Sequence, residues 1–173
     1  NVGDGEKAIS YLRDFKSDIA LIFEPVRSNY IETISTINQP IQAVMSQEHP
    51  LSKFKSINLA DCLKYPLALP PSPYAVREIL ETAAAEESLD LNPTVEAESY
   101  IFLHNFVSRK KNAISFEVEI DVPKQSLDRS ISTVPINLSK SHQGQIHLLK
   151  LQGRAFSGAT EQFIKQLLYV FNN

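Results

Sequence analysis

The chain has 173 residues, 43% of them apolar and 21% charged, which is enough to bury a core in one domain or in two small interleaved lobes. Its formal net charge of −3 argues against direct binding of nucleic acid, because neutralising phosphates requires a net basic face. No apolar run approaches the ~20 residues of a membrane span. The single cysteine, Cys62, excludes an internal disulfide and suits a reducing cytoplasm.

Apolar residues follow helical spacing in some segments and strand spacing in others. The nearly continuous apolar run at 18–23 has the length of a buried parallel strand, and the alternation over 145–151 also predicts a strand. Ser72 followed by Pro73 predicts a helix start, with Ser72 as the N-cap and Pro73 as the first helical residue. In chain order, we predict a helix over 5–16, a strand over 18–23, a weaker strand or an irregular stretch over 30–39, a strand over 41–46, a helical turn over 58–63, a strand over 67–69 and a helix over 72–88. These are followed by a strand over 94–97, a helix over 100–110, strands over 113–116 and 145–151, and a helix over 157–171.

Strands separated by helices of ten or more residues predict βαβ units, with helices on both faces of a parallel-rich sheet. Asp4 and Ser157 are the expected caps of the first and last helices. The segment 117–144 shows no long period, so no element is predicted there. In sheets of this kind ligands bind at the carboxyl ends of the strands.

Side chains at strand ends and helix starts are therefore the candidates for a binding site. Some of these residues also suit a purely structural role. Phe23 is suited to the core, Glu24 to a solvent-exposed position, and Ser72 and Ser99 to capping helices. The candidate residues are Phe23, Glu24, Ser72, Pro73, Tyr74, Ser99, Tyr100, Ser115 and Phe116.

Arg77 offers a cation near a helix start, where it would bind an anion or pair with Glu81 one turn later. The basic run over 109–111 is expected to be a solvated helix end. Cys62, within an apolar turn, is expected to be a buried small hydrophobe rather than a redox sensor.

No arrangement of residues indicates catalysis, a metal or a nucleotide. The five glycines form no phosphate-binding loop, and no Ser-His-Asp or Cys-His grouping stands out. The four histidines lack the spacing of metal ligands: His49, His104, His142 and His147. We therefore expect no enzymatic activity, no cofactor and no metal.

Several motifs recur in a fixed order along the chain. An apolar strand over 41–45 leads to His49-Pro50-Leu51, then to the segment 59–63 (Leu-Ala-Asp-Cys-Leu), the strand 67–69, and the Ser72-Pro73 helix start. Near the end, Arg154 is followed by Ser157, Ala159 and Phe163. This order resembles the effector-binding domain of LysR-type transcriptional regulators. One departure is the absence of glycine over 109–116, where the family often has a Gly-x-Gly-Ile turn.

The resemblance implies an α/β, two-lobed fold like that of type 2 periplasmic binding proteins, with mostly parallel sheets flanked by helices. Lobe I would comprise 1–40 and 141–173, incomplete at its N-terminus, and lobe II would comprise 41–140. The connections between the lobes would lie near Pro40-Ile41 and near 134–136. The family's N-terminal winged helix-turn-helix is expected to precede residue 1.

The resemblance also implies a function. A small-molecule effector would bind in the cleft between the lobes, and a carboxylate is natural there because helix N-termini present unpaired N–H groups. The full-length protein would be a cytoplasmic regulator that forms a homodimer or tetramer, does not enter membranes, and contacts promoter DNA through the missing N-terminal domain.

Two other functions stay open at this point. One is a periplasmic solute-binding protein of the same fold. The other is an enzyme on the same scaffold, similar to prephenate dehydratase or porphobilinogen deaminase, which would need a catalytic constellation.

Overall fold

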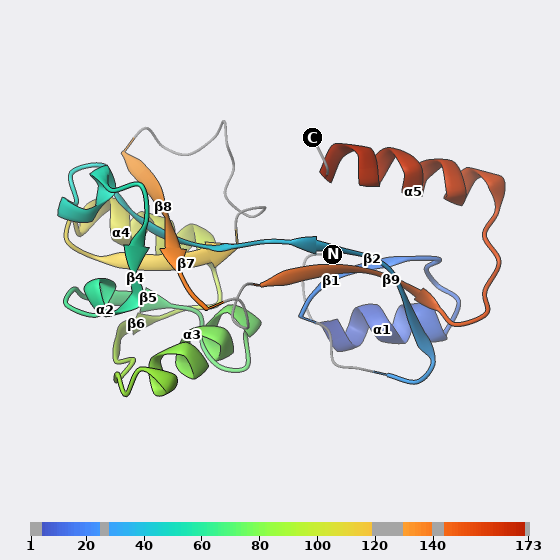
Figure 1. Ribbon diagram of the computed structural model, residues 1–173, viewed down its shortest axis with the longest axis horizontal. Helices are drawn as coiled ribbons and strands as arrows, with labels where there is room; N and C mark the ends of the chain where they lie inside the picture. The colour runs from blue at the N-terminus through green and yellow to red at the C-terminus, as the bar shows by residue number, and fades with distance from the viewer. Residues whose placement is uncertain (1–4, 25–27, 119–129, 140–143, 172–173) are drawn as a thin grey trace. The chain divides into compact units, whose positions relative to one another are not determined.

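The computed structural model describes residues 5–24, 28–118, 130–139 and 144–171 (Figure 1). The chain divides into two compact units. Unit 1 comprises Asn1–Asn38 and Gln145–Asn173, and unit 2 comprises Gln39–Gly144. Asp4, the expected cap of the first helix, lies outside the described residues.

Unit 1 is built on a three-stranded antiparallel sheet. Its strands are β1 (Ala20–Phe23), β2 (Ile31–Asn38) and β9 (Gln145–Leu151), with β9 between the other two. The helices are α1 (Gly5–Arg13) and α5 (Gly158–Phe171). Leu12 of α1 packs with Ile22 and Leu149 to form the core of this unit.

Helix α1 begins at Gly5 and ends at Arg13, and the backbone explains both positions. A Cβ at Gly5 would lie 3.1 Å from Cγ2 of Ile22, so glycine permits the close approach of α1 to β1. The helix ends at Arg13 rather than at residue 16, because Phe15 adopts a positive φ of 57° that stops a helix. Phe15 is consequently exposed instead of continuing the apolar face of α1.

Unit 2 is built on a six-stranded sheet in the order β4-β8-β3-β7-β5-β6. Its helices are η1 (Pro50–Lys53), α2 (Leu59–Cys62), α3 (Ala75–Glu86) and α4 (Tyr100–Arg109). Its strands are β3 (Ile41–Ser46), β4 (Ile57–Asn58), β5 (Leu67–Leu69), β6 (Pro93–Glu96), β7 (Ile114–Val118) and β8 (Ile131–Asn137).

Two helices cover the sheet of unit 2. The crossover from β5 through α3 moves outward to β6, and the crossover from β6 through α4 returns past β5 to β7. Right-handed crossovers in opposite directions place their helices on opposite faces, as Figure 1 shows for α3 and α4. On the α4 face, Leu103 and Val107 pack against Val44 and Ala68.

The α/β prediction with helices flanking sheets is confirmed, but the expectation of mostly parallel sheets is wrong. Of the seven strand pairs in the described part of the chain, four are antiparallel and three are parallel. The chain enters unit 2 through β3 and returns through β8, which pair antiparallel. It leaves unit 1 through β2 and re-enters through β9, also an antiparallel pair.

The segment 134–136, expected to connect the lobes, lies instead inside β8. Val134 is buried, and Pro135 pairs with Gln42 of β3. Proline is tolerated here because the pairing of β8 with β4 is confined to Ile136 and Asn137, so β8 has only one strand neighbour at Pro135.

Candidate functional site

The candidate site of unit 2 lies at one edge of its sheet. Strand β5 pairs in parallel with both β6 and β7, so the three strands have their carboxyl ends at the same edge. The segment 70–74 that follows β5 leads into α3, and the segment 97–99 that follows β6 leads into α4. The topology therefore brings Ser72, Pro73 and Tyr74 to the same edge as Ser99 and Tyr100.

The start of α3 differs from the prediction. The N–H of Tyr74 donates to the carbonyl of Pro71 at 3.1 Å, so residues 71–74 form a turn ahead of the helix. Helix α3 begins at Ala75 with Tyr74 as its N-cap and with no capping hydrogen bond from a side chain. The predicted capping role of Ser72 and first-turn role of Pro73 are therefore wrong. Ser72, Pro73 and Tyr74 are exposed, and the first N–H groups of α3 lack a side-chain cap.

The start of α4 has a conventional cap. The Ser99 Oγ accepts a hydrogen bond from the N–H of Phe102 at 3.3 Å, so the capping role of Ser99 is confirmed. Tyr100 packs against the buried cluster around Val44 and Ala68. Ile101 and Phe102 point the other way and are exposed, which leaves apolar surface beside the capped helix end.

Ser115 and Phe116 of β7 are both fully buried. Ser115 pairs with Val44 and Ala68 and shares their side of the sheet, so Phe116 lies on the opposite side. The Ser115 Oγ has no hydrogen-bond partner among the described residues. In this structure neither side chain reaches the surface of unit 2.

Phe23 and Glu24 belong to unit 1. Phe23 is half-buried and pairs with Ile146 of β9. Glu24 has a φ of 44° and is held twice by Gln145: its N–H donates to the Gln145 carbonyl at 2.9 Å, and its Oε1 accepts from the Gln145 N–H at 2.6 Å. Glu24 is thus exposed to solvent, as its structural reading expected, but it is anchored to β9 rather than freely solvated.

Arg77 is occupied by carboxylates. Its Nε donates to Oε1 of Glu81 at 2.6 Å, which confirms the expected pairing one turn along α3. Its Nη1 donates to Oε1 of Glu96 at 2.8 Å, a contact that links α3 to β6 and that the sequence did not predict. Arg77 is buried, so both contacts tie the helix to the sheet.

A second buried pair joins α4 to the sheet. Nε2 of His104 lies 2.6 Å from Oε1 of Glu117, and the two side chains are 18% and 0% exposed. The only sign of this pair in the sequence is a charged residue, Glu117, inside the apolar run of β7. Gln42 of β3 lies directly opposite Glu117 and is also buried.

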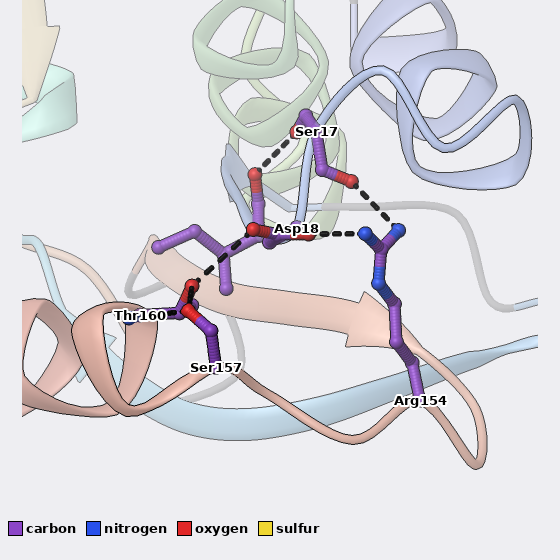
Figure 2. A network of polar contacts seen from close by, with 6 residues as sticks. Ser17, Asp18, Arg154, Ser157 and Thr160 are labelled. Atoms are coloured by element: carbon purple, nitrogen blue, oxygen red, sulfur yellow. Dashed lines mark hydrogen bonds and ion pairs between the residues drawn. The ribbon is translucent and has the colours of Figure 1, made fainter.

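The motif residues near the C-terminus form a polar network within unit 1 (Figure 2). The Asp18 carboxylate accepts hydrogen bonds from the Arg154 guanidinium and from the hydroxyl of Thr160, and Arg154 also reaches the carbonyl of Ser17. Ser157 caps α5 by accepting from the N–H of Thr160 at 3.2 Å, as predicted. The network joins the segment before β1 to the start of α5, which gives these motif residues a structural role.

His49 and Cys62 also have structural roles. Nδ1 of His49 accepts from the N–H of Leu51 at 3.1 Å, and the imidazole meets the Tyr65 ring edge-on with centroids 4.4 Å apart. Burial lowers the pKa of His49, against an opposing contribution from the backbone of Asn112. Burial raises the pKa of Cys62 to about 12, aided by the Asp61 charge, so the expected unreactive character of this thiol is supported.

Within the described residues, no group of three or more His, Cys, Asp or Glu side chains is placed to hold a metal ion. None of the helices in the described part combines the length and hydropathy that a membrane span requires.

The two compact α/β units, with mixed sheets flanked by helices, define the chain as a ligand-binding domain with the type 2 periplasmic-binding-protein-like fold. The family described as the LysR substrate binding domain matches residues 1–172. The chain therefore belongs to the LysR substrate binding domain family.

Several solved structures share this fold. The effector binding domain of QuiR in complex with shikimate is 24% identical, with a TM-score of 0.73 over 94% of this chain and 76% of that chain. The regulatory domain of Synechocystis PCC6803 CcmR in complex with 2-PG is 14% identical, with a TM-score of 0.78 over 98% of this chain and 81% of that chain. The Corynebacterium glutamicum OxyR C206 mutant is 17% identical, with a TM-score of 0.78 over 98% of this chain and 53% of that chain.

At these identities the likeness shows the fold alone. The chain spans 56% and 57% of two Pseudomonas aeruginosa LysR-family regulators, so it corresponds to about half the length of such proteins. A comparison with curated protein sequences found no match.

Proposed function

We propose that this chain is the effector-sensing domain of a LysR-type DNA-binding transcriptional regulator. The observation that carries the proposal is the family match, which extends over residues 1–172. The solved regulators of the same fold favour a regulatory role over a periplasmic solute-binding protein. The function is binding rather than catalysis, and the location is the cytoplasm, where promoter DNA is found.

The proposed effector is a small carboxylate. Support comes from the start of α3, whose first N–H groups have no side-chain cap, because such groups bind anions well. QuiR, which shares the fold, was solved with shikimate, itself a carboxylate. Exposed apolar side chains beside the same sheet edge, those of Tyr74, Ile101 and Phe102, would contact the carbon skeleton of the effector.

The proposed site combines residues from both lobes, as the family resemblance implies. From unit 2 it takes the start of α3 (Ser72, Pro73 and Tyr74) and the start of α4 (Ser99 and Tyr100), whereas Ser115 and Phe116 of β7 are fully buried and are not included. From unit 1 it takes Phe23 and Glu24. An effector that contacts both lobes would shift the population of interlobe angles by its differential affinity.

In the full-length protein this shift would change how a homodimer or tetramer presents its DNA-binding domains. This chain carries a net charge of −3, so promoter contact is assigned to an N-terminal domain outside it. We expect the full-length protein to retard promoter DNA in a gel and this chain alone to leave it unretarded.

A ligand-induced thermal shift tests the site. The chain is screened against shikimate and a panel of small carboxylates and aromatic metabolites, and then Ser72→Ala and Tyr74→Ala are compared with the wild type. Both variants should keep the unliganded Tm, because both side chains are exposed, and should lose most of the ligand-induced increase.

Tyr169→Ala is the matched control, because Tyr169 is an exposed tyrosine on α5, outside the proposed site. It should respond to ligand as the wild type does. A full thermal shift in both site variants would remove Ser72 and Tyr74 from the site. A panel without any stabilising member would count against the sensing function itself.

A further inference from the structure

Glu24 lies where the two connections between the units leave unit 1. The first segment of unit 1 ends at Asn38, and its second segment begins at Gln145. These two residues are register partners on β2 and β9, and Nε2 of Gln145 donates to Oδ1 of Asn38 at 3.1 Å. Glu24 follows β1, which pairs with the other side of β9. Gln145 is therefore held from both sides at the boundary of the unit.

The carboxylate of Glu24 takes a place in the strand ladder that a backbone carbonyl ordinarily occupies. In a hydrogen-bonded antiparallel pair, the two residues exchange both N–H···O bonds through their backbones. The N–H of Glu24 donates to the carbonyl of Gln145 at 2.9 Å, whereas the N–H of Gln145 donates to the Glu24 side chain, at Oε1, at 2.6 Å. The φ of 44° at Glu24 accounts for this, because it turns the chain out of the strand after Phe23. The last rung between β1 and β9 thus depends on a side chain.

The pairing of β2 with β9 continues past the boundary into unit 2. The N–H of Gln39 donates to the carbonyl of Gly144 at 2.8 Å, one residue beyond the pair of Asn38 and Gln145. The two connecting strands therefore leave unit 1 hydrogen-bonded to each other. A positive φ is unfavourable for a residue other than glycine, and the two bonds of Glu24 to Gln145 compensate for it. Backbone strain and a charged acceptor thus meet at the place where a hinge would bend.

We infer that Glu24 is a positioning residue of the hinge between the lobes. Its carboxylate fixes the backbone of Gln145, and the Gln145 side chain fixes Asn38, so both connecting strands leave unit 1 in one arrangement. The link to sensing rests on the proposed function: effector contact with Glu24 changes this clamp of Glu24, Gln145 and Asn38, and with it the population of interlobe angles. The clamp itself is measurable without any ligand.

Amide hydrogen exchange in Glu24→Ala and Glu24→Gln tests the clamp. Alanine keeps a Cβ at the positive φ and removes only the acceptor, so exchange at the Gln145 amide should accelerate by about fivefold or more. Glutamine keeps a neutral acceptor oxygen, so its exchange rate should lie between those of the alanine variant and the wild type. Glu32→Ala is the matched control, because Glu32 is an exposed glutamate on β2 that pairs with Lys150 at 3.3 Å. It should change exchange at the Gln145 amide by no more than about twofold.

The hinge is measured by the distribution of distances between spin labels on Lys7→Cys in α1 and Thr82→Cys in α3, one in each unit. Both positions are exposed, and the native cysteine is buried. Glu24→Ala should broaden the distribution, and Glu32→Ala should leave it unchanged.

Wild-type exchange at the Gln145 amide in Glu24→Ala would overturn the inference, because the carboxylate would then hold nothing. Faster exchange with an unchanged distance distribution would overturn it too, since the clamp would then have no effect on the hinge. Acceleration that extends equally to the amides of α1 would mean general loosening of unit 1 and would also overturn it. These readouts use no effector, so a failed ligand screen and a failed clamp are separate results.

Discussion

Arg77 was open to two interpretations from the sequence, and its substitution separates them. The structure gives its guanidinium two carboxylate partners, Glu81 on the same helix and Glu96 on β6. Arg77→Met keeps much of the apolar stem and removes both contacts, so it isolates the charged head group from the packing of the stem. Arg77→Ala removes the head group and the stem together.

The expected loss in the free energy of unfolding depends on how exposed Arg77 and its two carboxylate partners are. The Arg77 side chain is 10% exposed, but those of Glu81 and Glu96 are 44% and 48% exposed, so both carboxylates regain water when the arginine is lost. A hydrogen bond to a charged group contributes roughly 1.5–3 kcal/mol when buried, and half-exposed partners reduce this to about 1 kcal/mol each. We expect Arg77→Met to lower the free energy of unfolding by about 2 kcal/mol, and Arg77→Ala by about 3 kcal/mol because stem burial is also lost.

Urea denaturation followed by circular dichroism measures these differences, and thermal unfolding should show a fall of about 4–8 °C for Arg77→Met. The matched control is Lys64→Met, which removes an exposed pair with Asp61 at 2.7 Å and should leave the Tm unchanged. An Arg77→Met protein as stable as the wild type would refute the structural account. Loss of effector binding at unchanged stability would instead assign Arg77 to the ligand.

Three further outcomes follow from the structure. At pH 8, Cys62 should react with a maleimide about a thousandfold more slowly in the native than in the unfolded chain, since its pKa rises from 9.0 to about 12; rapid native labelling would contradict this. Because burial lowers the pKa of His49, the folded state favours the neutral imidazole. The stability that this contributes is present above pH 6.5 and should be lost as the pH falls below that value. His49→Asn should make the free energy of unfolding depend less on pH, as measured by urea titrations at pH 7.5 and 5.5. Asp18→Ala should accelerate hydrogen exchange at the Thr160 amide while the amides of α3 stay protected. Equal exchange at Thr160 in the variant and the wild type would show that the polar network of Asp18, Arg154 and Thr160 does not hold α5.

Most elements of this fold were predicted from the sequence, because their buried residues recur with the spacing of a helix or a strand. The strand over 145–151 matches β9 at both ends, and the strand over 41–46 matches β3. Strand β8 was missed because Pro135 and the polar residues around it give no strand period. Its burial arises from pairing with β3, a contact distant in sequence.

The candidate site was predicted less completely, for a similar reason. Residues that follow β5 and β6 were found because strand ends and helix starts have local signals, and the sheet brings them to one edge. The start of α3 was misplaced because Ser-Pro suits a helix start, whereas the turn between Pro71 and Tyr74 delays the helix by two residues. The pairing of His104 with Glu117 depends on a crossover that places α4 over β7, and no local pattern reports it.

The strand order of unit 1 has a consequence for synthesis on the ribosome. Unit 2 is one continuous segment, Gln39–Gly144, so it can fold as soon as that segment has emerged. The central strand of unit 1 is β9, and neither β1 nor β2 has a strand to pair with until residue 151 has been translated. We therefore expect unit 1 to remain unassembled on the nascent chain while unit 2 is already folded. During that interval the unpaired strands β1 and β2 of unit 1 are exposed and can bind chaperones.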